Sequence, residues 1–243
     1  MSADAATSAD GVPPVPLRET CRLVAGRVPL WRYHRARLAS GGCGEAVLER
    51  ADAAMLEASR SWSGPASSRL RLTLVVSAAG TIDAKVERRL SSLDVPGGPR
   101  LSVVEVAEPP ALPPGAAKPA DRSYWDDAQR RARAAGGDIA VLVTPDGRVV
   151  DGGTSTVWLV VDGAVLTPSA PPAVAGVARA FLLDALAGAG RPARVGPYPL
   201  SYLEHADDVF LTNAFGGFTA VRDHGGSDSA RLAREAFARL WEG

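Results

Sequence analysis

One stretch of this 243-residue chain, residues 109–119, is rich in proline, alanine and glycine. Such a composition favours a connector, because it suits neither a packed helix nor a strand. Before the stretch the apolar residues mostly alternate, as in strands, and after it helical and strand patterns are mixed. We therefore predict an α+β fold of two subdomains joined by one linker, an arrangement that often places a ligand site in the joint.

The expected boundaries follow from this pattern. Residues 17–108 form an N-terminal small α+β subdomain, residues 109–119 form the linker, and residues 120–243 form a larger C-terminal α+β subdomain. Residues 1–16 are small and polar with several prolines, and they lack the basic start and apolar centre of a signal peptide. We expect this first segment to be a disordered tail.

The spacing of apolar residues also predicts the individual elements. Strands are expected at 17–28 (a pair around a turn), 70–77, 81–90, 101–106, 138–144, 149–150, 156–161 and 208–211. Helices are expected at 31–39, 44–62, 122–135, 173–187, 201–205 and 228–241.

The composition argues against several classes of protein. The formal net charge is zero and the isoelectric point is about 6.8, whereas nucleic-acid and membrane-surface partners require a positive field. No apolar run is long enough to span a bilayer, and no Cys/His cluster suits zinc. Cys21 and Cys43 form no disulfide framework, so we expect a cytoplasmic protein. The histidines show no nucleophile or base partner and are expected to be structural: His34, His205 and His224.

Lysine is rare in this chain. Of the 27 basic residues only Lys85 and Lys118 are lysine, so the other 25 are arginine. A retained lysine is either drift or a site that needs a neutral amine, which arginine cannot supply. Lys85 falls in an alternating strand pattern, where an exposed charge suffices, whereas Lys118 falls in the predicted linker. Lys118 is therefore the candidate catalytic residue.

The residues that follow Lys118 form an ordered series of motifs. Lys118 precedes a predicted helix, and the next predicted strand, 138–144, ends in a Pro-Asp-Gly turn. Asp151, two glycines, Thr154 and Ser155 come next. In order and spacing the series resembles the class IV pyridoxal 5'-phosphate (PLP)-dependent aminotransferase family, over roughly residue 17 to the C-terminus. The resemblance implies the D-amino acid aminotransferase-like fold, PLP as cofactor, and a homodimer.

The resemblance also implies catalytic and substrate-binding roles. Lys118 would bond covalently to PLP and then shuttle protons. Asp151 would pair with the protonated pyridine nitrogen and make the ring an electron sink. Thr154 and Ser155 would reach the cofactor or the substrate, and Arg122 would bind a substrate carboxylate.

Three further segments match the family where it binds the PLP phosphate. The run from His34 to Leu38 resembles the H-x-x-R-L segment, in which Arg37 would hold the phosphate through its planar fork. Val177 and Ala178 lie in a run similar to the P-G-x-T-R helix start, whose backbone N–H groups bind phosphate. Asn213 and Ala214 lie in a run similar to the loop that closes the phosphate site.

Four features depart from the family pattern. Asp151 stands where glutamate is usual, and Ala178 stands where threonine is usual. The first strand reads Arg18-Glu19-Thr20, where the family has an aromatic residue before Glu-Thr. The usual opening hairpin with its Asn-Gly turn is missing before Leu17. These departures leave open a cofactor-free relative with a binding role.

Within the family, the chain is most similar to the 4-amino-4-deoxychorismate lyase branch. The cues are the abbreviated N-terminus near Leu17, an arginine four residues after the lysine, and the Asn213-Ala214 pair. The implied reaction releases 4-aminobenzoate and pyruvate from aminodeoxychorismate. The alternative is a transaminase for a branched-chain or D-amino acid, with the same lysine and a 2-oxo acid as second substrate. Fold alone does not decide between them.

Overall fold

The computed structural model describes residues 11–61, 69–107 and 111–242 and divides the chain into two compact units. Unit 1 contains residues 1–89 and 111–121, and unit 2 contains residues 90–110 and 122–243. The chain therefore passes from one unit to the other more than once. The predicted α+β class is confirmed, because each unit combines sheets and helices.

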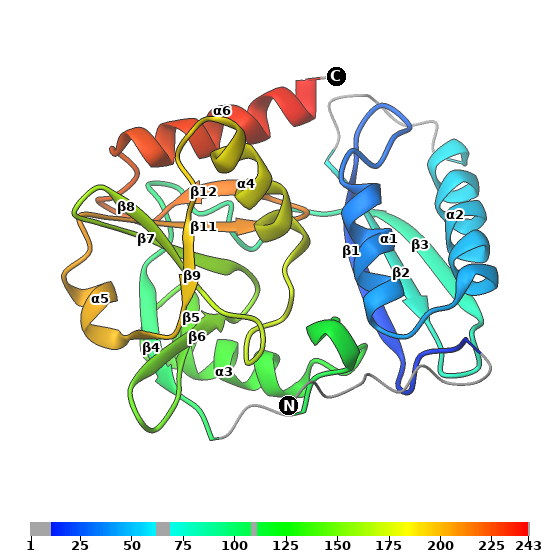
Figure 1. Cartoon of the computed structure of the whole chain (residues 1–243), viewed down its shortest axis with the longest axis horizontal. Coiled ribbons are helices and arrows are strands. Elements are labelled where there is room, and N and C mark those ends of the chain that lie inside the picture. The colour runs from blue at the N-terminus through cyan, green and yellow to red at the C-terminus, as the bar shows by residue number, and fades with distance from the viewer. Residues whose placement is uncertain (1–10, 62–68, 108–110, 243) are drawn as a thin grey trace. The chain divides into compact units, whose positions relative to one another are not determined.

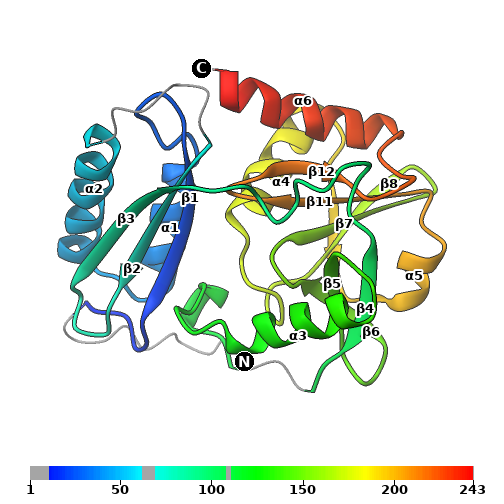
Figure 2. The same cartoon turned by 180° about the vertical axis from the view of Figure 1, so that it is seen from behind.

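Unit 1 is a three-stranded antiparallel sheet covered by two helices. The strands β1 (Leu17–Leu23), β2 (Leu70–Val76) and β3 (Ile82–Arg88) are hydrogen-bonded in that order. Burial alternates along β1 and β2, as it does when one face of a sheet is covered. Helices α1 (Trp31–Ser40) and α2 (Glu45–Arg60) lie on the same side of the sheet in both views (Figures 1 and 2).

The segment that carries Lys118 runs along the free edge of β1. A short 3₁₀ helix, η1 (Pro114–Ala116), comes first, and Pro119 then pairs antiparallel with Leu17. The Arg18 amide N–H donates to the Lys118 carbonyl at 3.0 Å, and the Ala120 amide donates to the Pro16 carbonyl at 2.8 Å. The backbone of Lys118 is thus held as a short extra strand of unit 1.

Unit 2 contains two sheets that share one apolar core. In the four-stranded sheet the order is β10 (Tyr198–Pro199), β6 (Arg148–Gly152), β5 (Ile139–Val143) and β4 (Leu101–Glu105). In the five-stranded sheet it is β12 (Gly217–Ala220), β11 (Asp208–Asn213), β7 (Thr156–Val161), β8 (Ala164–Pro168) and β9 (Arg194–Gly196). Buried Val141, Leu159 and Leu211 belong to one cluster and show that the two sheets pack together.

Helices cover the remaining faces of unit 2. Helix α3 (Ser123–Ala134) lies along β4 and β5 (Figure 2) and buries Trp125 and Ala128. Helices α4 (Val177–Gly188) and α6 (Asp228–Glu242) pack together through Phe181 and Phe237, and the short α5 (Leu200–Glu204) follows β10. Strand β5 is buried at every position, because α3 covers one face and the second sheet the other.

Several boundaries differ from the sequence prediction. Strand β4 belongs to unit 2 and not to the first subdomain, because it pairs in parallel with β5 over Leu101–Glu105. Residues 111–119, expected in the linker, belong to unit 1. Residues 11–16, expected in the tail, are anchored: the Gly44 amide donates to the Gly11 carbonyl at 2.7 Å, and Val12 packs on the core.

Other parts of the prediction fall on residues that are not described. Residues 1–10 of the expected tail, Trp62 at the end of the second predicted helix, and linker residues 109–110 lie outside the described part of the chain. Helix α4 begins at Val177 rather than at residue 173, since Pro171, Pro172 and the capping Gly176 come first. Strands β8, β9, β10 and β12 were not predicted.

Among the described residues, no helix is both long and apolar enough to cross a membrane. No group of three or more His, Cys, Asp or Glu side chains gathers there as a metal would require.

Candidate active site

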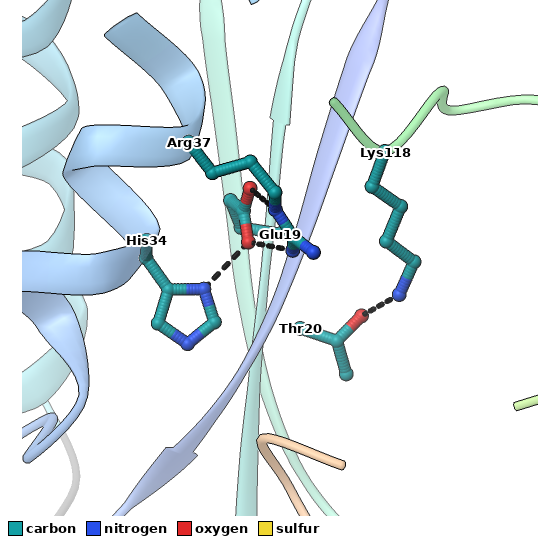
Figure 3. Close-up of polar contacts among 5 residues, drawn as sticks. All are labelled: Glu19, Thr20, His34, Arg37 and Lys118. Carbon is teal, nitrogen blue, oxygen red and sulfur yellow. Dashed lines mark hydrogen bonds and ion pairs between the residues drawn. The ribbon is translucent and has the colours of Figure 1, made fainter. Parts of the chain in front are cut away.

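Lys118 meets a hydroxyl group on the face of β1 that the helices leave uncovered. Its Nζ donates a hydrogen bond to Thr20 Oγ1 at 3.3 Å (Figure 3). Side chains alternate along a strand, and Leu17, Glu19 and Cys21 point toward the helices, so Thr20 points the other way. Because the Lys118 carbonyl is bonded to Arg18, the side chain starts from a fixed backbone position. The structure thus pairs a fixed amine with a proton-bearing hydroxyl.

The neighbouring residue, Glu19, lies at the centre of a buried cluster on the other face of β1. Arg37 donates from Nε to Oε1 at 2.9 Å and from Nη2 to Oε2 at 2.5 Å, a bidentate pair. His34 Nδ1 lies 2.5 Å from the same Oε2. Figure 3 shows the third guanidinium nitrogen of Arg37 directed away from Glu19. Glu19 therefore fixes the plane of the Arg37 fork.

Burial and charge set the protonation of this cluster. Burial alone would raise the pKa of Glu19, but the Arg37 cation and the hydrogen bonds from His34 and Arg37 lower this pKa to about 2. Burial lowers the pKa of His34, so the ring is neutral at neutral pH and donates its Nδ1 proton to Glu19. The cluster is then one ion pair, Glu19 with Arg37, supported by a neutral imidazole.

From the sequence, Arg37 was predicted to be a site residue, Glu19 was not, and His34 was expected to be structural. The available signal was the spacing of His34 and Arg37, which places them on the same side of one helix, three residues apart. A second signal was Glu19 at an inward position of an alternating strand. A carboxylate at an inward position needs a cationic partner, and Arg37 supplies it.

Asp151 is the most perturbed acid of unit 2. It lies near the end of β6 and is 7% exposed. Burial raises its pKa to about 8, and the Gly152 N–H, Arg179 and Arg122 offset only part of this effect. Burial in turn lowers the pKa of Arg179, which Asp151 partly offsets. A buried carboxyl with a raised pKa suits a ligand that brings a positive charge.

A tight loop follows Asp151 and presents the predicted substrate residues. The Gly152 amide donates to the Ser155 carbonyl at 2.8 Å, and Arg122 Nη2 donates to the Gly153 carbonyl at 2.9 Å. Thr154 is held at its carbonyl by Asn213 Nδ2, at 3.2 Å. The Ser155 hydroxyl is buried and has no hydrogen-bond partner among the described residues. Such a group indicates a ligand or water at this position.

The start of helix α4 lies against the same loop. A Cβ atom placed on Gly176 would lie 2.7 Å from Thr156 Oγ1, so only glycine lets the helix begin this close to β7. The first N–H groups of a helix, here those of Val177 and Ala178, have no acceptor within the helix and carry the positive end of its dipole. This arrangement is suited to bind an anion such as phosphate.

The turn after β11 completes this end of the five-stranded sheet. Thr156 and Thr212 are register partners, so Asn213 comes next to the loop after Asp151. The Asn213 Oδ1 accepts from the amides of Phe215 at 3.1 Å and Gly216 at 2.6 Å and shapes the turn that contains Ala214. The structure therefore gathers one set of predicted site residues in unit 2: Arg122, Asp151, Thr154, Ser155, Val177, Ala178, Asn213 and Ala214. The other two, Arg37 and Lys118, lie in unit 1.

The comparisons with known proteins agree on the family. The family model described as amino-transferase class IV matches residues 17–223, and the chain therefore belongs to this family of PLP-dependent enzymes. No curated protein sequence matches the chain.

Solved structures give the fold. The PLP-bound form of a hypothetical aminotransferase from Mycobacterium tuberculosis has a TM-score of 0.76 and 20% identity, over 98% of this chain and 94% of that chain. A putative 4-amino-4-deoxychorismate lyase has a TM-score of 0.73 and 21% identity, over 97% and 93%. A branched-chain aminotransferase from Thermoproteus uzoniensis, with norvaline, has a TM-score of 0.77 and 18% identity, over 94% and 86%.

The residues present fit the family's cofactor. The buried acid Asp151 suits a pyridine nitrogen, because the two groups would share one proton and neither would leave an unpaired charge in the interior. The amide groups at Val177 and Ala178 suit the phosphate. Lys118 would supply the primary amine that PLP requires. Asp151 in place of the usual glutamate does not remove this fit, since its carboxyl is present and buried.

Proposed function

We propose that this protein is a PLP-dependent lyase that converts 4-amino-4-deoxychorismate to 4-aminobenzoate and pyruvate. The observation that carries the proposal is the hydrogen bond from Lys118 Nζ to Thr20 Oγ1. The presence of Arg122 four residues after the lysine and of the Asn213-Ala214 turn adds support, since both resemble the lyase branch. We expect the enzyme to be a cytoplasmic homodimer, as the family resemblance and the free thiols of Cys21 and Cys43 suggest.

Each cofactor contact has a residue suited to it. Lys118 would bond to the cofactor, Asp151 would hold the pyridine nitrogen, and Arg37 together with the amides at Val177 and Ala178 would hold the phosphate. When bound, PLP supplies an electron sink that stabilises the charge developed on the substrate. Thr154 and Ser155 would contact the cofactor or the substrate.

The proton movements of the lyase reaction explain why a hydroxyl beside the amine matters. One proton leaves the ring carbon that bears the substrate amine, and the Lys118 amine accepts it. The carbon–oxygen bond to the enolpyruvyl group breaks, the ring becomes aromatic, and the released group gains a proton on its methylene carbon to become pyruvate. A second site must therefore receive a proton, and the Thr20 hydroxyl can relay one from Lys118.

A transaminase moves a proton between two carbons that lie next to one amine, so a single lysine suffices. The pairing of Lys118 with Thr20 suits the lyase reaction. The position of Arg122 and the Asn213-Ala214 turn favour the lyase over the alternative, an aminotransferase for branched-chain or D-amino acids.

The test supplies the PLP-loaded protein with aminodeoxychorismate and measures 4-aminobenzoate and pyruvate. We expect both products from wild type and from Lys85→Arg, a control at an exposed lysine of the same unit, and none from Lys118→Arg. Borohydride reduction followed by peptide mapping should place the cofactor on Lys118. Conversion of PLP to pyridoxamine phosphate by an amino acid would instead identify a transaminase. A fully active Lys118→Arg variant, or a label on Lys85, would overturn the proposal.

A further inference from the structure

The face of the unit 1 sheet opposite its two helices is strongly basic around Lys118. Arg18, Thr20 and Arg22 alternate with the buried positions of β1 and so share this face. Arg71 is the register partner of Arg22, and it lies on the same face. The Lys118 amine reaches this face through its hydrogen bond to Thr20. Four cationic side chains therefore lie on or reach the part of the face nearest β1.

Acidic residues on this face lie farther from Lys118. Glu87 forms an ion pair with Arg71 and lies 3.6 Å from Lys85. Asp83 belongs to β3, and Val75 of β2 lies between it and Arg18. The backbones at Asp83 and Arg18 are therefore two strand spacings, or about 10 Å, apart. On the described sheet, these two carboxylates thus belong to β3, two strands away from β1.

Arg18 is the closest of these cations to Lys118 along the backbone. Leu17 pairs antiparallel with Pro119, so the next pair in the same ladder is Arg18 with Lys118, and the Arg18 N–H bonds to the Lys118 carbonyl at 3.0 Å. Residues directly opposite in an antiparallel pair have side chains on the same face, with Cβ atoms about 5 Å apart. The Arg18 and Lys118 side chains therefore leave the backbone next to each other.

We infer that Arg18 is a specificity-determining residue that binds a carboxylate of the substrate held at Lys118. This inference rests on the proposed function, in which the substrate carries two carboxylates, one on the ring and one on the enolpyruvyl group. A guanidinium can bind a carboxylate with two parallel hydrogen bonds. The aromatic residue that is usual in the family at this position offers no such donor. Arg18 thus favours a substrate that places a carboxylate at this position.

The experiment measures binding separately from turnover. Chorismate is the probe, because it carries both carboxylates but a hydroxyl in place of the amine, and so cannot form a bond through that position. Its affinity for the PLP-loaded protein is measured by calorimetry, and KM and kcat are measured with aminodeoxychorismate. The variants are Arg18→Gln, Arg18→Phe, which restores an aromatic residue, and Arg18→Lys. The matched control is Lys85→Gln, a cation removed from the outer strand of the same face.

We expect Arg18→Gln and Arg18→Phe to weaken chorismate binding and raise KM by about tenfold or more, with a smaller change in kcat. Arg18→Lys should recover part of the loss, and Lys85→Gln should match wild type. Unchanged chorismate affinity in both folded variants, checked by thermal unfolding, would overturn the inference. If wild type releases no 4-aminobenzoate, the proposed function fails, while the chorismate titration still decides the role of Arg18.

Discussion

Replacing Glu19 by glutamine tests whether this buried carboxylate organises unit 1. The substitution keeps the shape of the side chain but removes its charge, so that Arg37 loses its counter-ion in the interior. The glutamine amide nitrogen would also direct N–H groups at donors on Arg37 or His34. Both effects are unfavourable, because an uncompensated buried charge and an unsatisfied buried donor each destabilise a fold.

The pKa of Glu19 gives the expected size of the effect. It lies at about 2 against an ordinary value of 4.5, a difference of about 2.5 units. At about 1.4 kcal/mol per unit, the charged form stabilises the folded state by roughly 3 kcal/mol at neutral pH. Because the folded pKa is the lower one, this contribution is complete above pH 4.5 and is lost as the pH falls from 4.5 toward 2.

Chemical denaturation of wild type and Glu19→Gln, at pH 7 and at pH 3, measures this contribution. We expect a loss of about 3 kcal/mol at pH 7 and a smaller difference between the proteins at pH 3. Glu45→Gln is the control, since Glu45 is 67% exposed and pairs with Arg35 at the surface, where an ion pair contributes at most about 1 kcal/mol. A Glu19→Gln variant as stable as the control at pH 7 would refute the reasoning.

Three further predictions concern the cofactor site. Lys118→Arg should abolish product release while circular dichroism and thermal unfolding remain unchanged; a folded variant that still releases product would contradict the assigned catalytic role. The pKa of Asp151 is about 8 in the folded state against an ordinary value of 3.8, so the cofactor-free protein should lose roughly 2 kcal/mol of stability between pH 6 and pH 8. Chemical denaturation should show that Asp151→Asn removes this pH dependence, while Asp146→Asn, at an exposed position, keeps it. Gly176→Ala should weaken PLP binding about tenfold in a fluorescence titration, because the new Cβ would lie 2.7 Å from Thr156 Oγ1. Adding Thr156→Ala in the same chain should restore part of the PLP affinity, and unchanged affinity in Gly176→Ala would contradict the close packing of α4.

Local pattern was sufficient to predict the α-helices of the described residues, α1 to α6, because most of them bury an apolar face with helical spacing. The 3₁₀ helix η1 was expected to be part of the linker. Strand β4 was predicted at the correct residues but was assigned to the N-terminal subdomain, whereas it belongs to unit 2, because its parallel pairing with β5 is non-local. Strands β9 and β10 are only three and two residues long, too short for a period to appear. Their conformation depends on pairing with β8 and β6, which no local pattern encodes.

The candidate site divides in the same way. Motif order identified the predicted residues of unit 2, and the structure gathers them because β7 and β11 are in register and α4 starts against β7. The role of Glu19 was not predicted, since its partners His34 and Arg37 come from a helix 15 and 18 residues away. The roles of Thr20 and Arg18 likewise could not be predicted, because they depend on the Lys118 segment lying beside β1.

The alternation of side chains along strand β1 positions both the Glu19–Arg37 pair and the Thr20–Lys118 pair. Glu19 points inward and fixes Arg37, whereas Thr20 points outward and meets Lys118. A shift of one residue in the pairing of β1 would exchange these faces and separate both pairs at once. The pairing of Leu17 with Val76 on one side and with Pro119 on the other opposes such a shift. The edge segment at Lys118 therefore serves the site twice, by carrying the amine and by holding the register of the strand that positions its partners.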